Sequence, residues 1–576
     1  MRMTRSATVL AASAALLSGW ILAPRLRAQV PDKPGAGSVP FIAREGVSVT
    51  NLDVVVTDAK GERVTGLRKE DFLVIEDGIE QPVTNFYAVE QGRVILPPDE
   101  APAPAAAPAP AAAPEPVPTP PPAPKTRIVI FIDNLHILAF DRNRVLRNVE
   151  QFVRDNVKGD VEGMIVTFNR TLKVRRKFTD DGRDLSDILK QIEEESALGS
   201  NNESEKRDVI KAIDDSSSAD QANDRIRQYA LAAENDLKFT FDAMKTTIDQ
   251  LAGVEGRKIF VHVSGGLPQS PGLELFDYLR QAYPNSTTYS MQQFEFDKTS
   301  SYLGIVQAAN SAGVSMYTID AGGLSVDSSV TAEQRSSSHR IDTFIERTNL
   351  QSMLQLMSEE TGGRAIINRN DVGLALKELQ KDYSSYYSIG YTSARSGLDR
   401  PHKVDVKLKN KKKMVVLARR SYIEKGFDTK VREAVTSALF FPREENSLAA
   451  SLKVGDPSPD GRGNFIVPIT LRVPYSRLAM LPEGSKVRGR LVFYFVVVDT
   501  EGKQSELTTQ PVPVVVDAKA FEAEGSRRDF VYDVKLVMIP GGQKLSLAIR
   551  DDVTNKVSYL QKAIFVSAFA GERPAK

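Results

Sequence analysis

Two short segments of the chain carry residue types that could do chemistry, and each follows an apolar run. The first is Asp133-Asn134-Leu135-His136-Ile137, and the second is His262-Val263-Ser264-Gly265-Gly266. An aspartate with two histidines offers ligands for a metal ion, and a serine between small residues offers a nucleophile. Ligands of open α/β sheets bind at the carboxyl ends of the strands, where both segments are expected. The predicted ligand-binding face consists of Asp133, Asn134, His136, Ser264, Gly265 and Gly266.

Each of these residues also has an ordinary structural interpretation. Asp133 at a strand end can cap the following helix or pair with a nearby base. His136 and His262 can be partly buried imidazoles that approach each other at neighbouring strand ends. The alternative is a transition-metal site made of Asp133 and the two histidines.

The segment around Ser264 resembles the nucleophile elbow of hydrolases only faintly. That motif is Gly-x-Ser-x-Gly followed directly by a helix, because small residues must flank the strained serine turn. Here His262 takes the first glycine position, and Pro268 and Pro271 interrupt the start of a helix. A serine hydrolase stays open as an alternative.

The composition of the 576-residue chain excludes several classes of protein. There is no cysteine, so disulfides, thiolate nucleophiles and zinc ribbons are excluded. The chain has 75 Lys and Arg against 74 Asp and Glu, a net charge of +1, which argues against a nucleic-acid partner. The four histidines form no His-x-x-x-His pair; they are His136, His262, His339 and His402.

Residues 1–28 have the features of a secretory signal peptide. Arg2 and Arg5 precede an apolar, alanine-rich run, and cleavage is expected near Ala28. The run is short for a membrane span, but an uncleaved anchor is the alternative and would be the one source of membrane contact. We therefore expect an exported protein, periplasmic or extracellular.

A tract of proline and alanine at 97–125 separates two kinds of pattern. Such a tract cannot bury a core and favours extended polyproline II conformations, so it is predicted to be a disordered, semi-rigid linker. Residues 126–382 then alternate buried strands with helical periodicity, which predicts an α/β domain with a doubly wound sheet. Within it, the polar stretch 183–253 is interpreted as a solvated helical insertion rather than part of a site.

The remaining folded segments are β-rich. Residues 44–96 and 383–424 are each undersized for an independent sheet. We hypothesise that they pair into one β-sandwich, with the α/β domain inserted between its halves. After a helical connector at 425–455, regular turn signals in 460–570 predict an immunoglobulin-like sandwich.

A group of lysines around Asn410 looks like a basic patch. The flanking residues 404–408 and 414–417 are strand-like, so the lysines are interpreted as decorating a hairpin and its turn. Their expected role there is protection of a sheet edge against aggregation. The alternative is attraction to an anionic polymer or surface. The lysines are Lys407, Lys409, Lys411, Lys412 and Lys413.

Several short motifs recur along the chain, at 52–58 with Gly61, and at 66–67, 71–72, 76–78, 361–365, 370–371, 386–391 and 419–422. Taken in their order and spacing, these motifs resemble those of the von Willebrand factor A-related proteins of acidobacterial secretomes. The resemblance covers about residues 47–422. It implies an integrin I-type fold, which usually binds its ligand through a divalent cation at the carboxyl ends of the central strands.

The ligand pattern that this resemblance implies is only partly present. The usual first strand ends in Asp-x-Ser-x-Ser, and here Asp133 is kept while Leu135 and Ile137 stand at the serine positions. A later carboxylate position holds Gly265, and the usual threonine position falls near Lys238 to Thr240. Magnesium requires octahedral oxygen ligands, so we predict a degenerate metal-ion-dependent adhesion site that holds no metal, or magnesium weakly through Asp133 and water.

Together these features predict an exported, non-enzymatic binding or scaffold protein. Its von Willebrand A-like domain would engage a protein partner at the face around Asp133 and Ser264, without a cofactor. The alternative is an envelope-associated hydrolase or a metal-dependent adhesion protein that acts at the same face.

Overall fold

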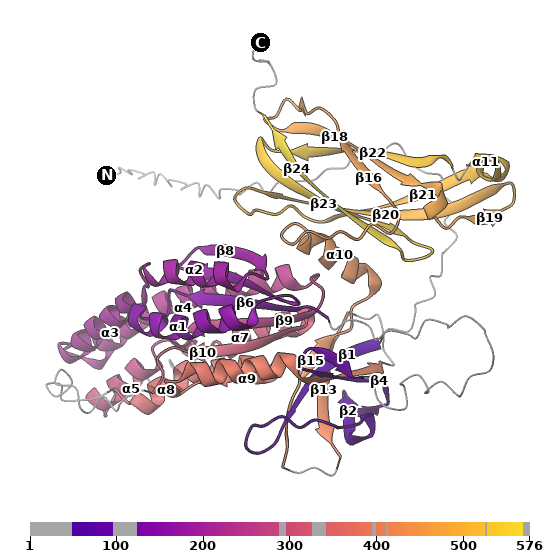
Figure 1. Ribbon diagram of the computed structural model, residues 1–576. Helices are drawn as coiled ribbons and strands as arrows, with labels where there is room; N and C mark the ends of the chain where they lie inside the picture. Colours follow the sequence, from indigo (N-terminus) through magenta and orange to yellow (C-terminus); the bar gives the residue numbers. More distant parts are fainter. Residues whose placement is uncertain are drawn as a thin grey trace, which may run out of the picture. The chain divides into compact units, whose positions relative to one another are not determined.

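The computed structural model describes residues 49–95, 124–286, 295–324, 341–393, 399–409, 413–524 and 527–567. The predicted signal peptide at 1–28, nearly all of the linker at 97–125, and His339 lie outside these ranges. The chain divides into two compact units, one of residues 44–437 and one that contains residues 438–576 (Figure 1). None of the described helices is long and apolar enough to cross a membrane.

The first unit is organised around a six-stranded sheet in the order β11-β10-β9-β6-β7-β8. Its strands pair in parallel except β8, which runs antiparallel to β7 at the edge. Strands β6, β9 and β10 are buried along almost their whole length, which explains their continuous apolar runs. The strands are β6 (Thr126–Asp133), β7 (Val161–Phe168), β8 (Leu172–Thr179), β9 (Arg257–Ser264), β10 (Val314–Asp320) and β11 (Ala365–Ile366).

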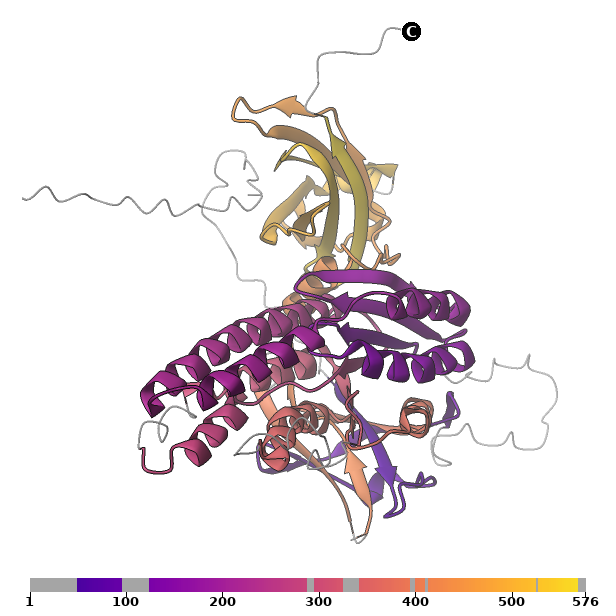
Figure 2. The ribbon, with the colours of Figure 1, turned by 90° about the vertical axis from the view of Figure 1, so that its left-hand side faces the viewer.

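Helices cover both faces of this sheet (Figures 1 and 2). Helices α1 (Ala139–Asn156), α2 (Gly182–Glu193) and α9 (Val372–Ser384) share one core with the residues Ile128, Ile130 and Ile132 of β6. The other side chains of β6 point to the opposite face, where α7 (Thr299–Ala312) and α8 (Thr343–Glu360) contact β10. Mixed α/β architecture is therefore confirmed for this region.

The stretch predicted as a solvated insertion at 183–253 is instead part of the packed domain. It forms α2, α3 (Gly199–Asp214) and α4 (Ala219–Leu251), and α3 and α4 lie side by side in Figure 2. The side chains of Leu185, Leu189 and Ile192 are fully buried in the core. The prediction was wrong because it relied on composition, and most residues of this stretch are charged or polar. The apolar residues among them recur at helical spacing, which is what allows the helices to pack.

The β segments before and after the α/β domain pair with each other. Strand β12 (Tyr386–Thr392) lies between β1 (Val49–Thr57) and β4 (Val83–Glu90) in one sheet, whose order is β14-β1-β12-β4-β5. In the other sheet, β13 (Pro401–Leu408) lies beside β2 (Phe72–Glu76), in the order β15-β13-β2-β3.

The two sheets enclose one apolar core, which contains Val54, Phe72, Tyr387 and Val404. The α/β domain is thus inserted within a β-sandwich. The shorter strands are β3 (Ile79–Gln81), β5 (Arg93–Ile95), β14 (Val415–Leu417) and β15 (Ser421–Ile423).

The lysine-rich segment does not form the predicted hairpin. Strand β13 pairs with β2 and β15, whereas β14 pairs with β1, so the two strands belong to different sheets. Lys407 lies in the part of β13 that pairs with β2, whereas β15 pairs with residues 401–403, so protection of a sheet edge at Lys407 stays a prediction. Lys407 also pairs with Asp405 at 2.7 Å on the exposed side of the strand. The sequence pattern could not separate a hairpin from a connection between sheets. Residues 410–412, which include Lys411 and Lys412, lie outside the described residues.

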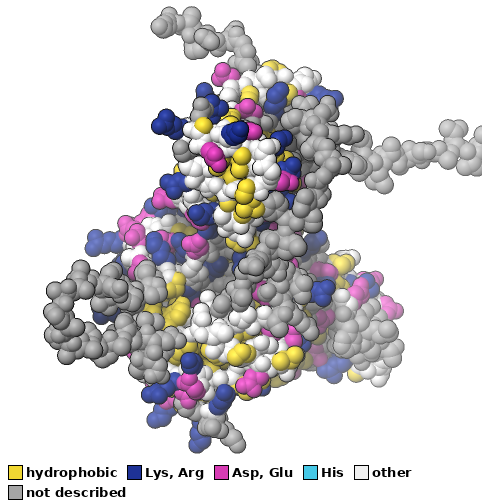
Figure 3. Space-filling view, turned by 90° about the vertical axis from the view of Figure 1, so that its right-hand side faces the viewer, with side chains coloured by type: hydrophobic (Ala, Val, Ile, Leu, Met, Phe, Trp, Pro, Cys, Tyr) yellow, Lys and Arg dark blue, Asp and Glu magenta, His cyan; other side chains and the backbone are white. Residues whose placement is uncertain are grey.

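Helix α10 (Phe427–Ser437) ends the first unit, and the second unit is a sandwich of two antiparallel sheets. One has the order β16-β18-β17, with β22 also paired to β18; the other has the order β19-β20-β23-β24, with β21 also paired to β20. The helical connector predicted at 425–455 is too long, because Leu448 and Ala450 are already in the sandwich core. Figure 3 shows one side of the molecule, on which basic and acidic side chains are interspersed.

Strand β18 of the second unit alternates buried with partly exposed residues, whereas β20 is buried without a break over residues 491–498. They are β16 (Ser451–Val454), β17 (Ser458–Pro459), β18 (Phe465–Pro474), β19 (Leu481–Glu483), β20 (Lys486–Asp499), β21 (Thr508–Asp517), β22 (Asp529–Met538), β23 (Gly541–Asp551) and β24 (Val557–Val566).

Candidate functional site

Asp133 ends β6 at the carboxyl edge of the central sheet and is fully buried. Its Oδ1 accepts hydrogen bonds from the backbone N–H groups of Leu135, at 3.1 Å, and His136, at 3.3 Å. This closes an Asx-type turn, in which the side chain stands in for a backbone acceptor. Asp133 therefore shapes the turn that precedes α1 and does not cap the helix, whose N-cap residue is Leu138.

His136 holds the other oxygen of this carboxylate. Its Nδ1 lies 2.9 Å from Asp133 Oδ2 and 3.5 Å from Thr240 Oγ1. Burial alone would raise the pKa of the Asp133 carboxyl, but the charge and hydrogen bond of His136 outweigh burial and hold that pKa below its ordinary value. Burial opposes the imidazolium in the same way, yet Asp133 raises the pKa of His136 above its ordinary value. The two groups therefore form a mutually stabilised ion pair inside the fold.

His262 approaches the same carboxylate from β9 but stays neutral. Its Nε2 is 4.0 Å from Asp133 Oδ2, and its ring lies 5.8 Å from the ring of Phe131. The side chain is fully buried, and within the described part of the chain neither ring nitrogen has a hydrogen-bond partner. Burial lowers the pKa of His262 to about 4. The structure thus brings both histidines to Asp133, and their pKa values are shifted in opposite directions.

Ser264 lies beneath the surface rather than on it. Its Oγ is 3.3 Å from Asp133 Oδ2, to which it donates, and the side chain is fully buried. The following Gly265 donates its N–H to the His136 carbonyl oxygen at 2.8 Å, and a Cβ at this position would lie 2.6 Å from that oxygen. Gly265 thus allows the loops after β6 and β9 to touch, and no nucleophile is presented.

Asn134 is also structural. Its Oδ1 accepts a hydrogen bond from Arg142 Nη1 at 3.1 Å, and its backbone N–H donates to the Phe168 carbonyl oxygen. The side chain is 2% exposed. Asn134 therefore fixes the start of α1 against the end of β7.

The positions at which hydroxyl ligands would be expected carry apolar side chains. Leu135 is completely buried and Ile137 is 1% exposed. Thr240 is the predicted ligand that does approach, although its Oγ1 meets His136 and donates to the Asp236 carbonyl oxygen. Throughout the described ranges, no three histidine, aspartate or glutamate side chains are grouped so that they could hold a metal ion.

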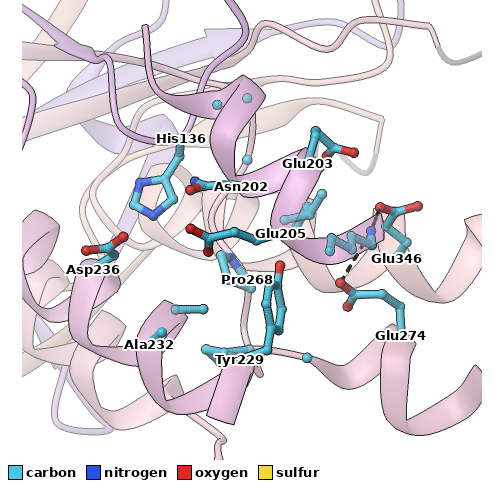
Figure 4. Close-up of a pocket in the computed structure, with 18 of the residues that line it drawn as sticks. His136, Asn202, Glu203, Glu205, Tyr229, Ala232, Asp236, Pro268, Glu274 and Glu346 are labelled. Atoms are coloured by element: carbon cyan, nitrogen blue, oxygen red, sulfur yellow. Dashed lines mark hydrogen bonds and ion pairs between the residues drawn. The ribbon is translucent and has the colours of Figure 1, made fainter. Parts of the chain in front are cut away.

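A cavity of about 470 Å³ opens beside this edge of the sheet (Figure 4). Of the predicted face, His136, Gly265 and Gly266 line the cavity, whereas Asp133, Asn134 and Ser264 do not. The rest of the wall was missed by sequence reasoning, because half of it comes from α3 and α4. The spacing of residues on α4 could have indicated this wall. Several positions that line the cavity lie three or four residues apart and so share one face of the helix: Tyr229, Ala232, Ala233 and Asp236.

The cavity wall carries more acidic than basic side chains. Its basic residues are Arg170 and Lys206; its acidic residues are Asp141, Glu203, Glu205, Asp236, Glu274 and Glu346.

Both basic side chains are already engaged by carboxylates of the same wall. Lys206 pairs with Glu274 at 3.4 Å and with Glu346, and these carboxylates overcome the effect of burial and raise the pKa of Lys206. Arg170 pairs with Asp236 at 2.9 Å. Burial, followed by the negative charge of Glu274, raises the pKa of the Tyr229 phenol as well. The cavity is thus an environment of negative potential.

Comparisons with known proteins show similarity in structure only. No protein-family model matches the chain, and no curated protein matches it. The chain is similar to a solved aerotolerance-related membrane protein of Bacteroides fragilis, with 11% identity and a TM-score of 0.22, over 45% of this chain and 98% of that one. It is also similar to the vWF domain of the type V pili tip protein Mfa5 from Porphyromonas gingivalis, with 10% identity and a TM-score of 0.26, over 45% of this chain and 95% of that one.

A longer solved piece of Mfa5, with three N-terminal domains, matches 76% of this chain and 70% of its own length, again at 10% identity and a TM-score of 0.26. The structural neighbours therefore include a von Willebrand factor A-type domain. TM-scores this low show nothing about function. The fold of the domain is defined by the strand order of its sheet.

Proposed function

We propose that the chain is an exported, non-enzymatic binding protein whose doubly wound, von Willebrand A-like domain engages a protein partner at the carboxyl edge of its sheet. The strand order with one antiparallel edge strand and helices on both faces supports this interpretation of the fold. The two sandwiches, the second of immunoglobulin-like type, would act as scaffold modules. A fold alone assigns no function, so the proposal depends on the site.

One observation carries the proposal: the charge of Asp133 is balanced inside the fold by His136. A divalent cation at this edge would need several oxygen ligands, but Asp133 is already bound by Nδ1 of His136 and two backbone N–H groups. Asp320, which ends β10 at the same edge, likewise accepts hydrogen bonds from Gln351 Nε2 and the Gly322 backbone N–H. Leu135, Ile137 and Gly265 supply no ligand side chain. The residues therefore do not fit a divalent metal ion, and the adhesion site is degenerate.

The same geometry supports a non-enzymatic role. Ser264 is fully buried and is bound to Asp133 rather than to a base that faces solvent. A serine nucleophile requires a neighbouring base and access to a substrate. A binding role needs neither, because a cavity with polar walls and exposed rims suffices.

Export of the protein is supported by the sequence. Residues 1–28 have the pattern of a signal peptide, and the chain has no cysteine that oxidation outside the cytoplasm could cross-link. A periplasmic or extracellular protein could then meet its partner in the cell envelope. The even charge balance supports a protein partner rather than a nucleic acid.

Capture of a partner from envelope extract by the immobilised mature chain tests the proposal. The variant Ala232→Trp fills the cavity from α4, at a position that lines it. Leu231→Trp is the matched control, because Leu231 is 47% exposed on the same helix and does not line the cavity. We expect one partner to be retained by the wild type and by Leu231→Trp but lost by Ala232→Trp. Equal capture by both variants would contradict a partner at this edge.

A further inference from the structure

We propose that the cavity beside His136 binds a basic side chain, the ammonium of a lysine or the guanidinium of an arginine, presented by the protein partner. This inference rests on the proposed function and specifies the chemistry of the group that the face recognises. It is carried by the shape of the cavity, by the excess of carboxylates in its wall and by polar groups that have no hydrogen-bond partner among the described residues.

The cavity has the size and position of a ligand site. Its volume of about 470 Å³ falls within the ~300–1,000 Å³ typical of small-ligand pockets. The loops after β6 and β9 form one side through His136 and Gly266, and α3 and α4 form another. Such a recess accommodates a long side chain and leaves the peptide that bears it on the rim.

The cavity already holds one ammonium group in the manner proposed. Lys206 of α3 is 8% exposed, and its Nζ lies between the carboxylates of Glu274 and Glu346. Two carboxylates around one ammonium repay much of its loss of hydration. The wall of this cavity can therefore receive a buried cation when two acidic groups converge on it.

A second pair of acidic groups converges at the other end of the cavity. Figure 4 shows the Glu205 carboxylate turned toward Asp236 and His136. Among the described residues, Glu205 forms no ion pair or hydrogen bond, and its exposed carboxylate lies close enough to influence the pKa of Arg170. A ligand cation between Glu205 and Asp236 would have a carboxylate on each side. The Lys206 ammonium has the same surroundings at the other end of the cavity.

Two polar groups of the wall, the Nε2 of His136 and the Tyr229 hydroxyl, point to a ligand that is not simply a metal ion. His136 is 11% exposed at its side chain and lines the cavity, and its Nδ1 is held by Asp133 while its Nε2 has no hydrogen-bond partner in the described part of the chain. The Tyr229 hydroxyl likewise has none there. A lysine or arginine side chain supplies the positive charge. The peptide that bears it supplies backbone groups that can form hydrogen bonds with these two polar groups.

Arg170 lies at this acidic end of the cavity. Its removal should change the affinity for a basic ligand in the opposite direction to the removal of a carboxylate. Its guanidinium binds Asp236 at 2.9 Å, yet the side chain is 61% exposed. A mobile surface ion pair of this kind is weak, so an incoming cation can displace it. Removing the Arg170 guanidinium should therefore strengthen the binding of a basic ligand, although Arg170 itself lines the cavity.

The test uses the mature full-length chain and three blocked glycine pentapeptides that carry lysine, arginine or norleucine at the centre. Saturation-transfer NMR titrations should show binding of the lysine and arginine peptides and none of the norleucine peptide. Glu205→Gln should weaken binding by about tenfold, because a hydrogen bond between charged groups is lost. Asp208→Asn is the matched control, since Asp208 is exposed on α3 and does not line the cavity. Arg170→Gln should strengthen binding several-fold.

The outcomes separate this inference from the proposed function. Equal binding of the norleucine peptide, or no effect of Glu205→Gln beyond that of Asp208→Asn, would overturn the basic-group site. If a partner is still captured in an Ala232-dependent way under those conditions, the proposed function stands and only the chemistry of recognition is wrong. If the peptides bind as expected and no partner is captured, the site is supported and the proposed function fails.

Discussion

Two buried aspartates in the first unit are neutralised in different ways. Asp382 of α9 is 1% exposed and binds Arg63, Arg364 and the Tyr317 hydroxyl, with 2.7 Å from Arg364 Nε and 3.0 Å from Tyr317 Oη. Asp133 is equally buried, but its charged partner is the imidazole of His136. One carboxylate is thus held by permanent cations and the other by an imidazole, whose positive charge depends on pH.

The difference corresponds to location. Asp382 lies where the sandwich meets the α/β domain, since Arg63 belongs to the connection after β1 and Arg364 to the segment before β11. A guanidinium clamp there holds the two parts together at any physiological pH. Asp133 lies beside the cavity, where an imidazole serves as the local cation and still presents its second nitrogen to a ligand. The contrast suggests that one cluster serves stability and the other serves recognition.

The largest expected effect is the loss of the Asp382 clamp. Asp382→Ala leaves two partly buried guanidiniums without their carboxylate, so it should lower the free energy of unfolding by about 3–5 kcal/mol. Urea unfolding of the full chain, followed through the transition of the first unit, measures this. Asp187→Asn is the control, because Asp187 is 70% exposed in a surface pair and should change stability by less than about 0.5 kcal/mol. If Asp382→Ala lowered the free energy of unfolding by less than about 1 kcal/mol, Asp382 would not be the stabilising cluster of this comparison.

The second prediction concerns the pH dependence that His262 imposes. Its pKa is about 4 in the folded chain and about 6.5 when unfolded, so protonation favours the unfolded state. The stability that neutral His262 contributes is present above pH 6.5 and is lost as the pH falls toward 4, by about 3 kcal/mol. His262→Leu keeps a similar volume and should remove this loss. Unfolding curves of both proteins between pH 7 and 4 should diverge in favour of the variant; parallel curves would contradict a buried neutral imidazole.

The pair of Asp133 and His136 should show the opposite sign. Because the pKa of folded His136 is raised, its contribution is fully present below about pH 6.5 and is lost as the pH rises through the folded pKa. Asp133→Asn should therefore cost about 2 kcal/mol at pH 6, and the cost should shrink as the pH rises through the folded pKa of His136. Urea unfolding over a series of rising pH values measures this change. A cost that stays constant over the whole series would show that His136 is not the cation that balances Asp133.

The smallest effect concerns Ser264. Its hydrogen bond to Asp133 is long, at 3.3 Å, so Ser264→Ala should cost about 1 kcal/mol and leave partner capture unchanged. Ser204→Ala, at an exposed position of α3, is the control and should be neutral. Labelling of the wild type with a fluorophosphonate should give no adduct on Ser264. An adduct would show a reactive serine and restore the hydrolase alternative.

The mixed α/β architecture could be predicted from the sequence because its strands are buried on both sides and read as continuous apolar runs. The runs that end at Asp133 and Ser264 illustrate this, since both became central parallel strands. Periodicity could not decide which strands share a sheet in the flanking segments. The connection around Asn410 was therefore taken for a hairpin, although β13 and β14 belong to different sheets.

The candidate site could be predicted only in part. Strand ends identified the loops with Asp133, His136 and Ser264, because parallel strands bring their carboxyl ends to one edge. The pattern could not show that His136 alone would bind Asp133 while His262 stays unpaired, since that depends on packing around both rings. It also missed the wall of α3 and α4, because Glu205 and Asp236 look like solvated charges on any exposed helix.

Calorimetric titration of the mature chain with magnesium, manganese and zinc, compared with Asp133→Asn, tests the central claim most directly. If His136 balances Asp133 inside the fold, the three ions should produce no saturable heat that depends on Asp133. Saturable binding below about 1 mM in the wild type, abolished by Asp133→Asn, would show a working metal site and contradict the account.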